Sequence, residues 1–133
     1  MVLVDSGVLI DVLSEDEPFN EVSSAVLASI ADRHELAINP IIFAELAARA
    51  PSLEAVERAL PPTSYLREEL PYRAAFLAGR AFAAYRRAGG TRRSPMPDFY
   101  IGAHAAVLKC AIVTRDTARY RRYFSTVPLI VPG

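Results

Sequence analysis

Short aliphatic and β-branched runs alternate with longer amphipathic segments along this chain. The short runs predict strands at residues 2–4, 36–39, 64–66, 111–114 and 127–131. The longer segments predict helices at residues 8–13, 21–33, 41–49, 53–60, 71–88, 97–109 and 117–123. Because this alternation is typical of a parallel sheet covered by helices on both faces, the predicted fold class is α/β.

One helix has a periodicity clear enough to predict its buried face. Apolar and small residues recur at helical spacing in the segment 21–33. The face expected to pack on the core comprises Val22, Ala25, Val26, Ser29 and Ile30.

Length and composition predict one soluble domain over residues 1–133. The chain has 133 residues and 52% hydrophobic content, enough for one core. The single cysteine, Cys110, excludes an intrachain disulfide and favours a reducing compartment. No apolar run approaches the roughly 20 residues that a membrane span requires. We therefore expect a cytoplasmic protein without a membrane partner.

The net charge of zero conceals a strong division between the two halves of the chain. Residues 1–70 carry 13 acidic side chains against 4 basic ones, whereas residues 71–133 carry 2 acidic side chains against 11 basic ones. Zero net charge argues against a polyanionic partner, but a basic half is still able to contact phosphate. Of the 15 basic residues only Lys109 is not arginine, which suits phosphate binding and is equally explained by a skewed genomic base composition.

Four carboxylates are expected to meet at one edge of the sheet. Asp5 follows the first predicted strand and Asp116 follows the fourth. Asp98 begins the helix that leads into the fourth strand, and Glu45 lies in the helix that leaves the second. Ligands of open α/β sheets bind at the carboxyl ends of strands, especially where the strand order reverses. Two strands that flank that point would bring Asp5 and Asp116 together, and right-handed crossovers are able to direct Asp98 and Glu45 to the same crevice.

Glu45 is the most informative of these acids, because the segment IIFAELAA around it is apolar on almost every side. A buried carboxylate must be protonated, paired or bound to a cation. Converging carboxylates without a lysine or histidine among them repel one another unless a hard divalent cation such as Mg²⁺ or Mn²⁺ neutralises them. Such an ion activates water for phosphodiester hydrolysis.

Each acid also has a purely structural explanation, and the sequence leaves both open. Asp5 is able to cap the following helix, and Asp98 suits the first turn of its own. Asp116 is able to cap the helix that carries residues 117–123. Glu45 is able to pair with Arg49 one turn later.

The segments that carry these acids resemble the PIN-domain family, and especially the VapC-like toxins of toxin–antitoxin pairs. They read VDSGVLID at residues 4–11, FAEL at 43–46, PDFYIGAHA at 97–105 and VTRD at 113–116. The resemblance implies a three-layer α/β/α sandwich with a five-stranded parallel sheet. It also implies an endoribonuclease that depends on Mg²⁺ or Mn²⁺, is restrained by a small antitoxin and forms a homodimer.

The resemblance assigns roles residue by residue. Asp5, Glu45, Asp98 and Asp116 match the acidic positions that hold the metal and carry catalysis. Ser6 and Thr114 match hydroxyl positions, where they would orient carboxylates or metal-bound water.

Several basic and aromatic residues are candidates for RNA contact. The loop around Gly89 and Gly90 is expected to hold a phosphate backbone near the metal, unless it is an ordinary solvated loop. Its arginines are Arg86, Arg87, Arg92 and Arg93.

Arg115 either contacts phosphate or pairs with an acid. Tyr120 and Tyr123 are expected to pack their helix on the sheet rather than stack on bases, and His104 is expected to face the core.

Two other functions compete with the nuclease hypothesis. One is a non-catalytic module of the same fold that binds nucleic acid together with a small DNA-binding partner, although clustered carboxylates are of no use to it. The other is a phosphatase or phosphotransferase with Asp5 as nucleophile, but the second acid common in that chemistry is replaced by Gly7. The apolar helices between residues 21 and 60 would bury a partner helix or a second copy of the chain, or simply pack the core.

Overall fold

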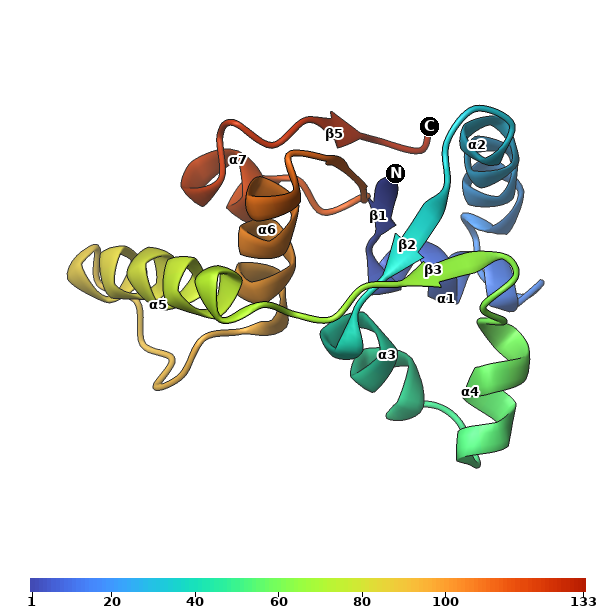
Figure 1. The fold of residues 1–133 in the computed structure, drawn as a ribbon, viewed down its shortest axis with the longest axis horizontal. Coiled ribbons are helices and arrows are strands. Elements are labelled where there is room, and N and C mark those ends of the chain that lie inside the picture. Colours follow the sequence, from blue (N-terminus) through green and yellow to red (C-terminus); the bar gives the residue numbers. More distant parts are fainter.

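Five parallel strands form the centre of the computed structural model, which describes residues 1–133 (Figure 1). The strands are β1 (Val2–Val4), β2 (Leu36–Ile38), β3 (Tyr65–Arg67), β4 (Ala111–Val113) and β5 (Leu129–Ile130). Their order across the sheet is β3-β2-β1-β4-β5, and every neighbouring pair is parallel. The strand order reverses between β1 and β4, so this pair forms the topological switch point.

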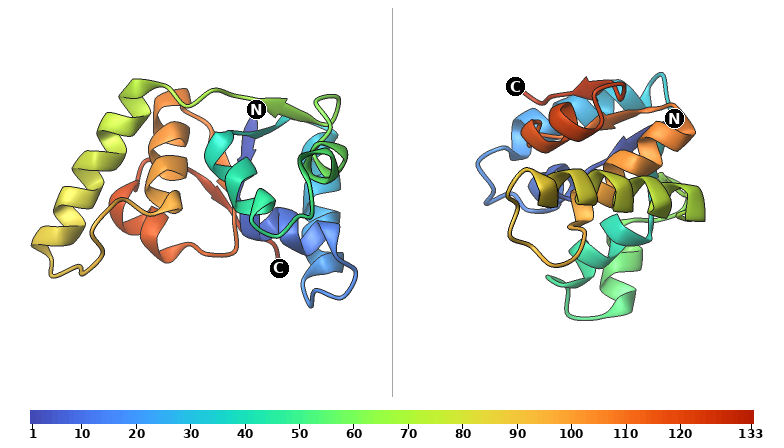
Figure 2. Two further views of the ribbon diagram at one scale, coloured as in Figure 1. Left: turned by 90° about the horizontal axis from the view of Figure 1, so that it is seen from below. Right: turned by 90° about the vertical axis from the view of Figure 1, so that its left-hand side faces the viewer.

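Helices flank the sheet in two groups. They are α1 (Ser6–Leu13), α2 (Asn20–Ala31), α3 (Pro40–Ala47), α4 (Leu53–Ala59), α5 (Tyr72–Arg87), α6 (Pro97–Leu108) and α7 (Ala118–Tyr123). The first four lie on one side of the molecule and the last three on the other, with α5 against α6 (Figure 1, Figure 2). The predicted α/β class, with its five-stranded parallel sheet, is confirmed.

This arrangement separates the two charge classes in space. Residues 1–70 supply α1 to α4, and residues 71–133 supply α5 to α7. The acidic half and the basic half therefore occupy opposite sides of the molecule, and they meet where β1 lies beside β4 (Figure 1). No helix in the structure has the length and apolar character needed to cross a membrane.

The core confirms the predicted strands, but α2 buries its predicted face only in part. Ile30 is buried as predicted and Val26 packs against the core, whereas Val22, Ala25 and Ser29 are exposed. Ser23 and Leu27 are buried in their place. Ser23 is able to lie in the core because its hydroxyl donates to the buried carboxylate of Asp11, at 2.8 Å.

Strand ends differ from the predicted ones by one or two residues for local reasons. The strand predicted over residues 127–131 is reduced to Leu129–Ile130, because Pro128 has no N–H and the N–H of Val127 donates to Phe124 instead. β3 begins at Tyr65 rather than at residue 64. The N–H groups of both residues close a turn on the carbonyl of Pro61 before the strand starts.

Candidate active site

Asp5 and Asp116 come from the two strands that flank the switch point. β1 and β4 pair directly, with Val4 opposite Val113, and the N–H of Asp5 donates to the carbonyl of Val113 at 3.0 Å. The chain leaves β1 at Asp5 and enters α1, while it leaves β4 at Thr114 and turns towards α7. The parallel pairing therefore holds these two strand ends side by side, as the sequence predicts.

Asp5 is held by three donors. Its Oδ1 accepts from the backbone N–H of Ser6 at 2.8 Å, so that Asp5 caps α1. Its Oδ2 accepts from the Thr114 hydroxyl at 2.7 Å and from the Tyr120 hydroxyl at 3.2 Å. The capping role and a place among the acids are thus compatible, because the two oxygens face different partners.

A second hydroxyl joins Glu45 to this arrangement. Ser6 donates through Oγ to Glu45 Oε1 at 2.9 Å. The ion pair with Arg49, one of the alternatives for Glu45, is not formed. Glu45 instead reaches from α3 towards the start of α1. Ser6 and Thr114 therefore each orient one of the carboxylates.

Three of the carboxylates act on one another electrostatically. Burial raises the pKa of Asp5 above its ordinary value against the opposing effect of its hydrogen bonds, and the charge of Asp98 raises it further. Burial also raises the pKa of Glu45, and the charges of Asp5 and Asp98 add to this effect. The pKa of Tyr120 is raised by burial and by the same group of acids. These residues share one region of negative potential.

Asp98 differs from Asp5 and Glu45 because it has a cationic partner. It lies in the first turn of α6, and Arg119 Nη1 lies 3.0 Å from its Oδ2 and 3.2 Å from its Oδ1. The Arg119 guanidinium lies over the rings of Tyr85 and Phe99, 5.6 Å and 5.3 Å from their centroids. Asp98 therefore lies in the first turn of α6, as the sequence suggests. This position still allows its carboxylate to contact Arg119.

Asp116 is exposed and lines two small pockets. One, of about 290 Å³, includes Asp5 and Thr114, and the other, of about 300 Å³, includes Asp98 and Arg119. Asp116 does not cap α7, because the N-cap residue is Thr117 and no side chain caps that end. Its backbone N–H donates to the Thr114 hydroxyl at 3.1 Å, which links it to Asp5 through Thr114.

The donor chemistry of these acids fits a hard divalent cation. They offer only carboxylate oxygens, and two of them have pKa values raised in part by neighbouring negative charge, which a cation would relieve. With the side chains as they stand, no three acidic, histidine or cysteine residues are grouped to hold one ion.

Sequence reasoning missed Asp11, although a signal for it exists. This α1 residue is only 1% exposed, and its carboxylate accepts from Arg115 Nε at 2.7 Å and Nη2 at 2.8 Å. Burial would raise the pKa of Asp11, but its bonds with Arg115 and Ser23 outweigh burial and lower it. The argument applied to Glu45, an acid within an apolar helix, applies equally to Asp11 in VLIDVL. Of the two roles open for Arg115, the structure has the ion pair.

The basic loop is folded back on the end of α5. Arg86 donates through Nη1 to the carbonyl of Arg92 at 2.9 Å, and the Tyr85 hydroxyl accepts from the N–H groups of Thr91 and Arg92. A Cβ at Gly90 would overlap the Tyr85 ring, so only glycine fits there. The loop is therefore ordered by its own contacts, and its arginine side chains, which are those of Arg86, Arg87, Arg92 and Arg93, are exposed.

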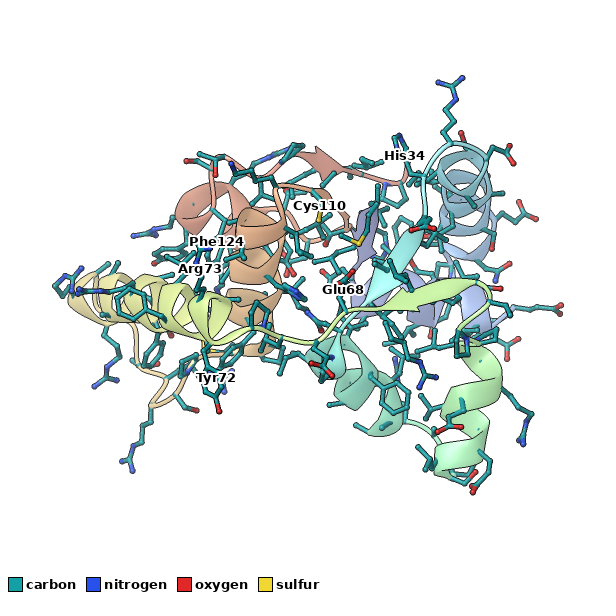
Figure 3. The ribbon with its side chains drawn as sticks, viewed as in Figure 1. His34, Glu68, Tyr72, Arg73, Cys110 and Phe124 are labelled. Atoms are coloured by element: carbon teal, nitrogen blue, oxygen red, sulfur yellow. The ribbon has the colours of Figure 1, made fainter.

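Packing between α6 and α7 fixes the distance between Asp98 and Arg119. Figure 3 shows Phe124, just after α7, beside α6. A Cβ at Gly102 of α6 would overlap the Phe124 ring.

Tyr120 is buried, as predicted, and so is His104, whose Nδ1 lies 3.0 Å from the Asn39 amide nitrogen. Through Asn39, the N-cap of α3, His104 supports the helix that carries Glu45.

A family model and several solved structures match this chain. The model of the PIN domain matches residues 2–124. The chain belongs to the PIN-domain family. PIN domains are generally nucleases. No curated protein sequence matches the chain.

Known structures share the fold of this PIN domain at low sequence identity. VapBC2 from Rickettsia felis, bound to a DNA fragment from its promoter, has a TM-score of 0.75 and 16% identity, with both chains covered completely. VapBC-1 from nontypeable Haemophilus influenzae has a TM-score of 0.73 and 17% identity, with 98% of each chain covered. FitAcB from Neisseria gonorrhoeae has a TM-score of 0.68 and 23% identity, with 98% of this chain and 96% of the other covered.

Proposed function

We propose that this PIN domain is an endoribonuclease dependent on Mg²⁺ or Mn²⁺, and that it is the toxin of a type II toxin–antitoxin pair. The observation that carries the nuclease proposal is the gathering of carboxylates from distant segments of the chain. Thr114 and Ser6 hold Asp5 and Glu45 by hydrogen bonds, and Asp116 shares one pocket with Asp5 and another with Asp98. Such a set of oxygen ligands suits a hard divalent cation. The toxin assignment is supported by the likeness to toxin–antitoxin structures such as the complex from Klebsiella pneumoniae.

In this proposal the ligands of the ion are Asp5, Glu45, Asp98 and Asp116. A bound divalent ion would activate a water molecule and offset charge on the leaving oxygen. Ser6 and Thr114 keep Glu45 and Asp5 in place through hydrogen bonds of 2.9 Å and 2.7 Å. These hydroxyls fix the direction of the carboxylate lone pairs, as supporting groups in metal sites generally do.

The charge division suits an RNA substrate. The site lies where the acidic and the basic halves of the molecule meet, so it combines carboxylates for metal with nearby arginines for phosphate. Arg87, Arg92 and Arg93 are exposed, and they lie in the segment between α5 and α6, the helix that carries Asp98. We propose that they, with Arg86 at the base of the loop, hold the RNA backbone. Arg115 is a further candidate for phosphate contact, and its ion pair with Asp11 also gives it a structural role.

Cleavage of RNA by the purified protein tests the nuclease proposal. We expect cleavage in Mn²⁺, none in EDTA, and a loss of about 100-fold or more in Asp98→Asn. Asp32→Asn changes an exposed acid at the end of α2 by the same atom and serves as the matched control, with activity retained. Cleavage that persists in EDTA, or that is unchanged in Asp98→Asn, would refute the proposal. Binding of RNA without cleavage in Mn²⁺ would favour the non-catalytic module.

Growth of a host cell tests the toxin proposal separately. Induced expression of the wild-type chain alone is expected to arrest growth, and Asp98→Asn is expected to remove the arrest at equal protein level. An active nuclease in vitro whose expression leaves growth unchanged would contradict the toxin role and leave the nuclease role in place.

A further inference from the structure

Asp98 is the one proposed metal ligand whose negative charge is already matched by a cation of the chain. Arg119 places a single nitrogen, Nη1, within 3.2 Å of both Asp98 oxygens. Asp5 and Glu45 accept hydrogen bonds only from hydroxyl groups and one backbone N–H. The cation thus lies on one side of the site, at the pocket that Asp98 shares with Asp116.

Arg119 has a second set of contacts that does not depend on Asp98. Its guanidinium carbon lies 5.6 Å from the centroid of the Tyr85 ring and 5.3 Å from that of Phe99. The faces of aromatic rings attract cations, so this position stays favourable for a guanidinium when the carboxylate turns away. The side chain is 33% exposed and that of Asp98 is 22% exposed, so water is able to replace either partner.

We infer that Arg119 is a resident counter-ion that competes with the divalent metal for Asp98. This inference rests on the proposed metal-dependent function. A metal ion bound by Asp98 would face the positive guanidinium at short range, so the ion pair must open for the carboxylate to bind metal. Because a single-nitrogen contact at a partly exposed site is weak, a dication is able to displace it. Arg119 therefore lowers the affinity of the free protein for metal without abolishing it.

Mn²⁺ titration by calorimetry tests the inference, because it measures binding without measuring cleavage. Arg119→Gln is expected to bind Mn²⁺ about 3-fold more tightly than the wild type. Arg121→Gln removes the same charge from an exposed position of the same helix and is expected to leave the affinity unchanged. Arg119→Lys keeps the charge and is expected to bind no more tightly than the wild type. Thermal unfolding of each variant establishes that it is folded.

A double variant separates competition at Asp98 from a general charge effect. In an Asp98→Asn background, Arg119→Gln is expected to change Mn²⁺ affinity by less than it does in the wild-type background. Equal or weaker binding by Arg119→Gln, or the same gain from Arg121→Gln, would overturn the inference. In those cases Mn²⁺ binding by the wild type would leave the proposed function standing. A chain that binds no Mn²⁺ in any variant would overturn both.

Discussion

Two arginine–aspartate pairs come from the same stretch of chain after β4, and they are built differently. Arg115 meets Asp11 with two nitrogens at 2.7 Å and 2.8 Å, and the carboxylate is 1% exposed. Arg119 meets Asp98 with one nitrogen at 3.0 Å and 3.2 Å, and that carboxylate is 22% exposed. A two-nitrogen contact to a buried acid holds a structure together, whereas a one-nitrogen contact at a pocket is able to exchange partners.

The difference matters because the two arginines line different pockets beside Asp116. The pair with the buried acid connects α1 to the residue just before Asp116, so it fixes the segment that leaves β4. The Arg115 guanidinium also lies 4.1 Å from the centroid of the Phe19 ring, which adds an interaction outside the ion pair. The exposed pair joins two helices of the basic half. The first interaction thus holds the backbone around the proposed site, and the second engages Asp98, one of its proposed ligands.

Removing each arginine is the strongest way to break this comparison. Arg115→Ala leaves Asp11 charged, buried and without its cation, so the free energy of unfolding is expected to fall by about 3 kcal/mol. Arg119→Ala leaves Asp98 able to hydrate, and the loss is expected to stay below about 1 kcal/mol. Urea unfolding of the two variants measures both values. Equal losses would show that the two pairs are energetically alike and would remove the distinction between them.

A change in helix packing is expected to disturb only the exposed pair. Gly102→Ala would press a methyl group against Phe124 and move α7 away from α6, at a cost of about 2 kcal/mol. The shift separates Arg119 from Asp98. It leaves Arg115 beside Asp11, because Arg115 precedes α7. We therefore expect the effect of Arg119→Gln on Mn²⁺ affinity to diminish in this background.

Gly79→Ala is the matched control for this packing change. Gly79 is also a helical glycine, but a Cβ there would meet no atom within 4 Å. Alanine is the better helix former, so this variant is expected to gain about 0.5–1 kcal/mol. If Gly102→Ala were equally stabilising, the close packing of α6 on Phe124 would not limit the position of α7.

The sequence predicts the frame of the site well because strand ends and topology depend on local patterns. Asp5 and Asp116 each follow a short aliphatic run, and parallel neighbouring strands bring such positions together without any knowledge of side chains. Glu45 becomes a candidate by the same local reasoning, since an acid in an apolar helix requires a partner. The partner itself, the Ser6 hydroxyl, is distant in sequence and follows from the packing of α3 against α1.

The two ion pairs lie outside the reach of the sequence patterns. Arg115 and Arg119 are four residues apart in one arginine-rich segment, and nothing local indicates that one meets a buried acid and the other a proposed ligand. The same limit explains why only part of the buried face of α2 is predicted. Ser23 is able to be buried because its hydroxyl donates a hydrogen bond to Asp11, and a scale of hydrophobicity does not represent a polar pair in the core.

The pH dependence of unfolding tests the contribution of Asp11 to the ion pair with Arg115. Because the pKa of Asp11 is lowered in the folded protein, its stabilising contribution is complete above the unfolded value of about 4. That contribution is lost as the pH falls towards the folded value. The difference in stability between the wild type and Arg115→Ala should therefore be largest near neutral pH and narrow below about pH 4. Urea unfolding at several pH values measures this, and a constant difference would exclude Asp11 as its source.

Substitution of Glu45 is expected to change the stability least. Unlike Asp11 and Asp98, Glu45 has no cationic partner. Its pKa is raised in the folded state by burial and by Asp5 and Asp98, so ionisation of Glu45 costs stability as the pH rises from the unfolded value through the folded one. Glu45→Gln keeps an oxygen for the Ser6 hydroxyl and removes this cost. It should gain about 0.5–1 kcal/mol at neutral pH and nothing near pH 3, where the wild-type side chain is protonated in both states.

Mn²⁺ should reverse the stability difference between Glu45→Gln and the wild type. The ion would bind the same negative charge that destabilises the metal-free fold. Saturating Mn²⁺ is expected to raise the melting temperature of the wild type more than that of Glu45→Gln. Glu57→Gln, at an exposed position of α4, should match the wild type with and without metal. A Glu45→Gln variant that is less stable than the wild type at neutral pH would mean that the carboxylate is stabilised by partners within the protein. In that case the site would need no dication to balance its charge.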